Sequence, residues 1–244
     1  MKIGEVNIRK IFHSLKELLG RDIFGQGFLY KIICKNEIME INKMSSEEKD
    51  KGIKIKEKIY VKYDKGDKEG NRWVFETPYY IKWDTKTVSW FQDNSGKKGS
   101  GMPVLRNKEF FFKSGFCWSD VHTTYLRSRL KEESVYDVAS MSLSSINSKI
   151  DNRYLVCLIN SKFVAEYQEN FLNNTSHFQI NDARKLPIVI PSKEISKKFI
   201  NIFKSTEKIK RTFYKKEISF DEQNVALSKI EKENDLLVEN TYGC

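Results

Sequence analysis

The sequence predicts an α+β fold in which a mixed β-sheet precedes a helical C-terminal arm. Apolar residues make up 39 % of the 244 residues, enough for a sizeable domain with a buried core. Alternating and short apolar segments, typical of strands, prevail in the middle of the chain, whereas helical periodicity prevails after Pro191. We therefore divide the chain into one domain over residues 1–190 and a helical arm over residues 191–244.

The first domain is expected to open with a helix, because apolar residues from Ile8 to Leu19 recur at helical spacing. Residues 53–63 alternate between apolar and mostly lysine side chains, which predicts a half-buried strand with a basic outer face. The loop over residues 93–103 is rich in glycine, serine and lysine, and suits either a phosphate chain or plain solvent. Further short strands are expected at Trp73–Phe75, Tyr79–Trp83, Val88–Phe91, Phe110–Gly115 and Tyr154–Ile159.

Helices are expected to dominate the last third of the chain. One should begin at Ser161, and a short strand should follow at Ile188–Ile190 between two prolines. Ser192 can cap a long amphipathic helix, and Ser219 and Glu222 have the spacing of a capping box at the start of a second one. The apolar stripe of this arm should pack against the domain or against another protein element.

The charge of the chain favours a polyanionic partner, since 43 Lys and Arg residues against 33 Asp and Glu residues give a net charge of +10. Between Lys97 and Lys131 there are eight basic residues and two acidic ones, so more than half of the net charge lies in one short segment. A lysine-rich surface without a nucleic-acid role is the competing explanation. No apolar run suits a membrane span or a signal peptide, which predicts a cytoplasmic protein with no membrane partner.

No complete catalytic, metal or cofactor site is recognisable, and no residue is assigned a catalytic role. The four cysteines are far apart in the sequence and are expected to be reduced thiols rather than zinc ligands. No glycine-rich nucleotide loop occurs, and the three histidines lie in different segments. The carboxylates of Asp64, Asp67 and Glu69 lie beside lysines, which leaves a divergent metal-dependent nuclease with its own active site as the alternative function.

The segment from Phe116 to Arg129 combines hydrogen-bonding side chains of several geometries with two arginines, a set that suits base edges and phosphates. Within it, Trp118 is expected to be a core aromatic residue. The predicted DNA-binding residues are Lys97, Lys98, Arg106, Ser119, His122, Thr123, Thr124, Arg127, Arg129 and Thr175.

Three segments resemble one known family, at residues 71–107, 110–119 and 158–192. The first begins with Asn-Arg-Trp, the second is an aromatic stretch ending in Gly-x-x-Trp-Ser, and the third runs from Leu-Ile-Asn-Ser to Leu-Pro-Ile-x-Ile-Pro. They resemble the target-recognition region of type II restriction-modification, adenine-specific DNA methyltransferases with a TaqI-like C-terminal specificity domain. The third segment is the most specific of the three.

The resemblance implies a specificity domain that binds double-stranded DNA and directs methylation, with or without cleavage by the parent enzyme, at one site. It implies a methyltransferase domain, in the same polypeptide or complex, as the partner that carries S-adenosylmethionine, and no cofactor or metal in this chain. The sequence lacks that methyltransferase domain, so it represents either a fragment of a longer polypeptide or a stand-alone subunit. The metal-dependent nuclease and a basic interaction domain without a DNA role remain as alternatives.

Overall fold

The computed structural model describes residues 33–54, 57–64, 71–77, 79–98, 107–118, 126–136, 141–172 and 177–244. The helix predicted between Ile8 and Leu19 lies outside these ranges. The chain has an α+β fold and forms two compact units. Unit 1 comprises Met1–Tyr63 and Tyr79–Phe112, and unit 2 comprises Asp64–Pro78 and Lys113–Cys244.

Unit 1 combines two short antiparallel strands with short helices. Val61 of β1 pairs with Ile81 of β2. The elements in chain order are η1 (Lys35–Glu37), η2 (Ile41–Lys43), α2 (Ser46–Lys51), β1 (Tyr60–Asp64), β2 (Tyr80–Lys82), α3 (Thr85–Asn94) and η3 (Lys108–Phe110). The predicted strand at Tyr79–Trp83 is confirmed as β2, whereas the strand predicted from residue 53 begins only at Tyr60.

The core of unit 1 forms around Trp83, which is fully buried. The rings of Phe111 and Phe112 meet its indole edge-on, with centroids 6.0 and 5.4 Å away. The chain passes close to this core at Gly52, whose φ is +94° and where an added Cβ would lie 2.7 Å from the carbonyl carbon of Asp84. Only glycine fits this position without moving the backbone.

The strand predicted at Val88–Phe91 is wrong, because these residues lie within helix α3. The carboxylate of Asp84 accepts a hydrogen bond from the backbone N–H of Thr87 at 2.8 Å and thereby caps the helix. Val88 is its buried residue. The capping hydrogen bond of Asp84 favours a helix here, although the short aromatic run has a high propensity for strands.

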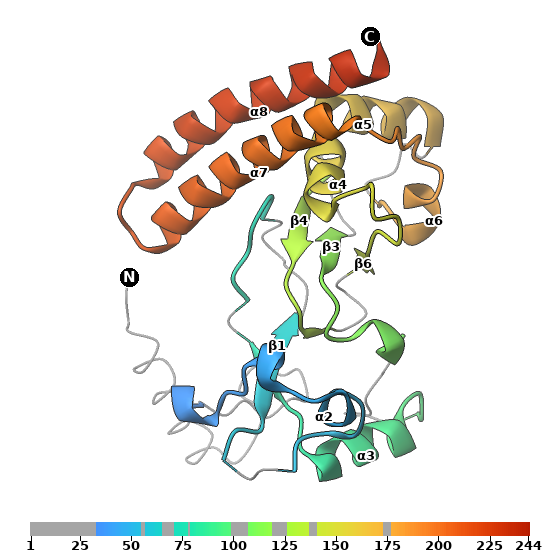
Figure 1. Ribbon diagram of the computed structural model, residues 1–244, viewed down its shortest axis with the longest axis vertical. Helices are drawn as coiled ribbons and strands as arrows, with labels where there is room; N and C mark the ends of the chain where they lie inside the picture. The colour runs from blue at the N-terminus through green and yellow to red at the C-terminus, as the bar shows by residue number, and fades with distance from the viewer. Residues whose placement is uncertain are drawn as a thin grey trace. The chain divides into compact units, whose positions relative to one another are not determined.

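Unit 2 is built on a three-stranded antiparallel sheet of order β4-β3-β6, followed by helices (Figure 1). Its elements are β3 (Gly115–Trp118), β4 (Ser128–Lys131), β5 (Val135–Tyr136), β6 (Met141–Leu143), α4 (Asn152–Ile159), α5 (Lys162–Tyr167), the π-helical turn η4 (Gln168–Leu172), α6 (Ile180–Ala183), α7 (Lys193–Tyr214) and α8 (Phe220–Tyr242).

Two of the expected strands in this region take other forms. Most of Phe110–Gly115 forms a 3-10 helix end and a turn before β3 begins at Gly115. Trp73–Phe75 is not a strand, and Trp73 alone makes an isolated bridge with Arg129. The strand propensity of these short aromatic runs is thus outweighed by the tertiary contacts of the segments around them.

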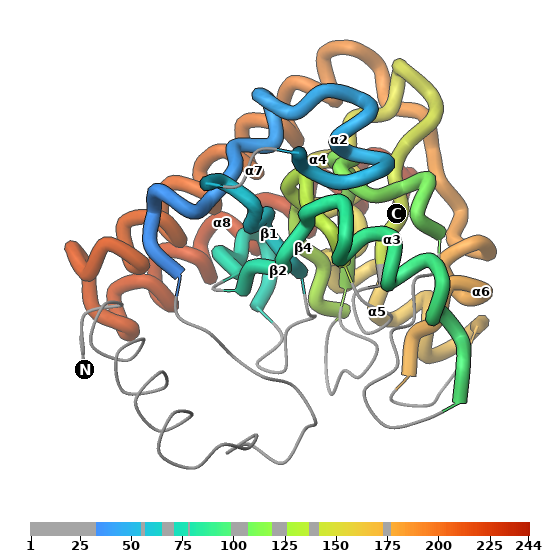
Figure 2. Tube along the Cα trace, turned by 90° about the horizontal axis from the view of Figure 1, so that it is seen from below, coloured from blue at the N-terminus to red at the C-terminus, as the bar shows by residue number. Residues whose placement is uncertain are grey.

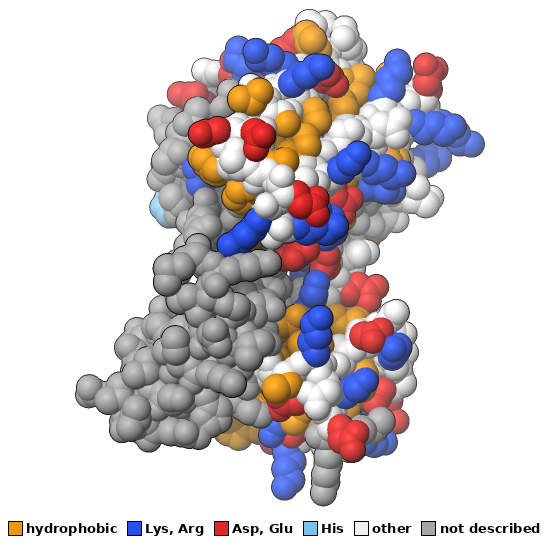
Figure 3. All heavy atoms as spheres, turned by 90° about the vertical axis from the view of Figure 1, so that its left-hand side faces the viewer, with side chains coloured by type: hydrophobic (Ala, Val, Ile, Leu, Met, Phe, Trp, Pro, Cys, Tyr) orange, Lys and Arg blue, Asp and Glu red, His pale blue; other side chains and the backbone are white. Residues whose placement is uncertain are grey.

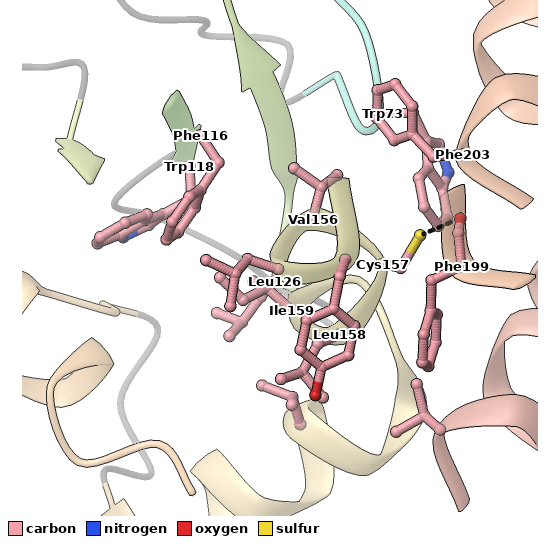
Figure 4. Close-up of a cluster of buried hydrophobic side chains, with 14 of the residues drawn as sticks. Trp73, Phe116, Trp118, Leu126, Val156, Cys157, Leu158, Ile159, Phe199 and Phe203 are labelled. Atoms are coloured by element: carbon pink, nitrogen blue, oxygen red, sulfur yellow. Dashed lines mark hydrogen bonds between the residues drawn. The ribbon is translucent and has the colours of Figure 1, made fainter. Parts of the chain in front are cut away.

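Helix α4 is the centre of the unit 2 core. The buried strand predicted at Tyr154–Ile159 is wrong, since Asp151 caps a helix there by accepting from the N–H of Arg153 at 2.8 Å. The six residues Tyr154–Ile159 are all buried, and α4 packs against both the sheet and α7. Figure 4 shows Val156, Cys157, Leu158 and Ile159 in this core. A helix buried on every side has no polar face, so its sequence resembles that of a buried strand.

The cysteine of this helix is a structural core residue. Cys157 is fully buried, and its Sγ lies 3.5 Å from the carbonyl oxygen of Phe199 on α7 (Figure 4). Burial in this apolar surrounding raises the pKa of the Cys157 thiol, so the thiol stays protonated.

The two long C-terminal helices are confirmed at both predicted starts. Ser192 accepts from the N–H of Ile195 at 3.2 Å, and Ser219 and Glu222 form the expected capping box. Helices α7 and α8 lie side by side and belong to unit 2 (Figure 1, Figure 2). The strand predicted at Ile188–Ile190 is wrong, because these residues have no regular structure. No helix in the described ranges is long and apolar enough to cross a bilayer.

Candidate nucleic-acid interface

The structure describes four of the ten residues predicted to bind DNA. Lys97 and Lys98 follow α3 in unit 1, whereas Arg127 and Arg129 belong to unit 2. The others lie outside the described residues: Arg106, Ser119, His122, Thr123, Thr124 and Thr175. The basic segment of the sequence is therefore divided between two units and does not form one described surface.

Basic charge alone does not locate the interface. On the face shown in Figure 3, lysine and arginine side chains lie among carboxylates and apolar groups over the described part of the chain. Lys97 and Lys98 are exposed, and the Nζ of Lys97 donates to the Oδ1 of Asn94 at 3.2 Å. Both remain accessible to a phosphate.

The predicted DNA-binding role of Arg129 does not agree with its buried position. Its side chain is 2 % exposed, and its Nη2 donates to the Oδ1 and Oδ2 of Asp64 at 3.0 and 3.2 Å. Its guanidinium also lies 5.6 Å from the ring centroid of Phe75. A guanidinium enclosed in this way is a structural group and is not available to a base edge or a phosphate.

Lys131, two residues further along β4, is buried as well, with 4 % of its surface exposed. Its Nζ lies 3.4 Å from the centroid of the Tyr136 ring. Burial lowers the pKa of Lys131 to about 8, although Cys117 and Asp64 act in the opposite direction. Because Lys131 is buried and Lys108 pairs with Asp50 at 2.7 Å, the basic segment presents fewer free charges than its sequence suggests.

We expect Lys131→Met to raise the free energy of unfolding by about 1 to 3 kcal/mol at pH 7, because it removes a buried charge without changing much volume. The pKa of Lys131 falls from 10.5 to about 8 on folding. Below pH 8, burial of the charged side chain therefore lowers the stability by its full amount. This loss of stability disappears as the pH approaches 10.5, because the lysine is then neutral in the folded protein. Urea unfolding at pH 7 and pH 10 measures this, and a gain of equal size at both pH values would contradict it.

The hairpin of β3 and β4 has a buried, well-connected base. Trp118 pairs with Ser128 across the two strands, and both residues are fully buried. The indole Nε1 of Trp118 donates to the carbonyl oxygen of Phe178 at 2.8 Å, and the prediction that Trp118 is a core residue is confirmed. The chain that joins the two strands contains five predicted DNA-binding residues: Ser119, His122, Thr123, Thr124 and Arg127.

Asn160 holds this hairpin from the side, and sequence reasoning assigned it no role of its own. Its Oδ1 accepts from the N–H of Ser128 at 2.9 Å, while its Nδ2 donates to the carbonyl oxygen of Ser128 at 2.8 Å. The side chain thus pairs with β4 as a neighbouring strand would. The sequence does mark this position, because Asn160 directly precedes Ser161. Ser161 caps α5 by accepting a hydrogen bond from the N–H of Val164.

The Asn-Arg-Trp segment bonds to the backbone of β4 at the same residue as Asn160. The N–H of Trp73 donates to the carbonyl oxygen of Ser128 at 2.9 Å, and the N–H of Leu130 donates to the carbonyl oxygen of Trp73 at 3.0 Å. Trp73 is buried with a φ of 72°, in a tight turn closed between Val74 and Arg72. Such a conformation is strained for a bulky residue and persists because its surroundings hold it.

Arg72 joins residues 71–77 to the end of α4 and to α8. The Nη2 of Arg72 donates to the carbonyl oxygen of Asn160 at 2.6 Å, and its Nη1 forms an ion pair with Glu231 at 3.0 Å. The indole Nε1 of Trp73 also donates to Glu231 at 3.0 Å. Arg72, Trp73 and Asn160, which belong to two of the three segments that carry the resemblance, are therefore scaffold residues of unit 2.

The chemistry of the described residues offers no metal centre, since no group of three or more His, Cys, Asp or Glu side chains among them could hold an ion. Asp64, one of the carboxylates considered for a nuclease site, pairs with Arg129 at 3.0 Å. Asp67 and Glu69 lie outside the described residues. No protein-family model matches the sequence, and no curated protein matches it either.

Proposed function

We propose that this chain is a DNA sequence-recognition domain of a restriction-modification, adenine-specific methyltransferase. The observation that carries the proposal is the β3–β4 hairpin, whose connecting sequence contains two threonines, a serine, a histidine and Arg127. Its ends are closed by the buried pair of Trp118 and Ser128. Binding residues are commonly presented on a rigid base.

The base of this hairpin supports a reading role because Ser128, beside the predicted DNA-binding residues, is held from two directions. Asn160 and Trp73 both hydrogen-bond to the backbone of Ser128, from α4–α5 and from residues 71–77 respectively. Arg127, next to this anchor, is partly exposed. Arginine can bind guanine bidentately in the major groove or clamp a phosphate.

The proposal includes the partners that the family resemblance implies. Double-stranded DNA is the ligand, and a methyltransferase domain of the same polypeptide or complex carries S-adenosylmethionine and the chemistry. The location is then cytoplasmic, where DNA and the cofactor meet. The coding sequence next to this one offers a direct check, because a methyltransferase domain should be encoded immediately upstream or in a neighbouring gene.

The proposal predicts that the chain binds duplex DNA with an affinity that falls steeply as salt rises, since phosphate contacts release counterions. Fluorescence anisotropy of a labelled random duplex measures this over KCl concentrations of about 50 to 300 mM, the range in which phosphate contacts weaken. Selection from a random duplex library should enrich one sequence. Arg127→Ala should cost about 1 to 3 kcal/mol on that sequence and relax the preference at one base pair.

A matched control is Arg184→Ala, which removes an exposed arginine on the C-terminal side of α6. This variant should keep the selected sequence and the affinity of the parent chain. Salt-insensitive binding, or no binding to duplex at low salt, would overturn the proposed function. Magnesium-dependent cleavage of the duplex by the chain alone would favour the nuclease instead.

A further inference from the structure

Helix α7 carries a row of exposed lysines along one side. At 3.6 residues per turn, the members of this row fall within a sector of about 60° on the helix surface. The buried residues of the same helix, among them Phe199 and Phe203, are centred about 140° away. The row consists of Lys193, Lys197, Lys204 and Lys208.

The row has a single sign of charge, which is unfavourable for an isolated helix. Lys193 and Lys197 are four residues apart, as are Lys204 and Lys208, and like charges at this spacing repel. Within the described ranges, no ion pair reaches any of these four side chains. The nearby carboxylates pair with other residues, since Glu194 lies 3.8 Å from Lys198, and Glu207 lies 2.8 Å from Arg211.

The surroundings of the row favour a phosphate chain over a lipid surface. Between its two halves, Lys198 and Asn201 are exposed and Ile200 is half-buried. The apolar side of α7 packs into the core of unit 2, around Phe199 and Phe203. A helix that binds a bilayer needs an exposed apolar face to insert beside its lysines, and α7 offers none on this side.

We propose that the lysine row of α7 binds the phosphate backbone of duplex DNA beyond the recognised bases. The row is about 22 Å long at 1.5 Å per residue, which matches about six base pairs at 3.4 Å each. Lysine acts here as a point charge that contacts phosphates and carries no base preference. This inference rests on the proposed function and extends the DNA footprint to the C-terminal helices.

The test replaces all four lysines in the full chain, as Lys193→Gln, Lys197→Gln, Lys204→Gln and Lys208→Gln together. Binding to a long random duplex, of about 40 base pairs, should fall at least roughly tenfold at 0.1 M KCl. The slope of log affinity against log salt should decrease in magnitude by about 3 to 4, near 0.9 for each lost phosphate contact. The sequence enriched by library selection should stay the same.

A charge-matched control replaces four exposed lysines elsewhere, namely Lys86, Lys149, Lys229 and Lys232. It should lose less than about twofold in affinity and keep most of the salt slope, because only Lys229 and Lys232 among these positions are neighbours on one helix. Circular dichroism should show that both variants keep their helix content. The α7 variant should melt no lower than the parent chain, since it removes like-charge repulsion.

The outcomes separate the two proposals. If the parent chain does not bind duplex DNA, the proposed function fails and the row loses its ligand. If it binds and the α7 variant binds equally well, or the control loses as much affinity, only the inference on α7 is overturned. Binding to vesicles containing phosphatidylserine completes the test. If the four lysines are needed to bind these vesicles but not to bind DNA, the row belongs to a lipid-binding surface.

Discussion

Arg129→Met is expected to lower the free energy of unfolding by about 3 to 5 kcal/mol, the typical cost of removing one partner of a buried ion pair. The guanidinium of Arg129 is 2 % exposed and the side chain of Asp64 is 9 % exposed. Methionine fills a similar volume but leaves the carboxylate of Asp64 without its donor at 3.0 Å. Urea unfolding followed by circular dichroism measures the loss.

The double variant Asp64→Leu and Arg129→Met is the control for this prediction. It replaces both charges with apolar groups, so it should recover most of the stability lost in the single variant. A DNA-reading role for Arg129 makes a different prediction, namely a folded Arg129→Met protein of parent-like stability that binds DNA weakly. That result would restore Arg129 to the interface and contradict its structural role.

Asn160→Ala should lower the free energy of unfolding by about 2 to 4 kcal/mol, because it leaves the buried N–H of Ser128 without an acceptor and removes a second hydrogen bond. The two bonds between Asn160 and Ser128 measure 2.9 and 2.8 Å. Since Ser128 closes the β3–β4 hairpin, the same variant should also bind DNA less tightly under conditions where it is still folded. Denaturant unfolding and anisotropy measure the two effects.

The matched control is Asn201→Ala, which removes an exposed asparagine from α7. It should change the stability by no more than about 0.5 kcal/mol, as surface substitutions generally do. If Asn160→Ala were as mild as this control, the contacts of Asn160 would not be what anchors the hairpin. Loss of DNA binding without loss of stability would instead place Asn160 near the ligand.

The C-terminal helices could be predicted from the sequence because their signals are local. Ser192 caps α7, and the side chains of Ser219 and Glu222 satisfy the first backbone groups of α8. Each of these contacts joins residues three positions apart, so it depends on the neighbouring sequence alone. The same holds for Ser161 at the start of α5.

The sequence by itself thus determined the α+β class, the two long helices and their starts, and an excess of basic charge. It could not determine which charges remain exposed, because Arg129 is neutralised by Asp64, 65 residues away. Nor could it identify the helix at Tyr154–Ile159, whose apolar residues have no solvent side to set a period. Only the tertiary structure decided these points, since burial and pairing arise where distant segments pack together.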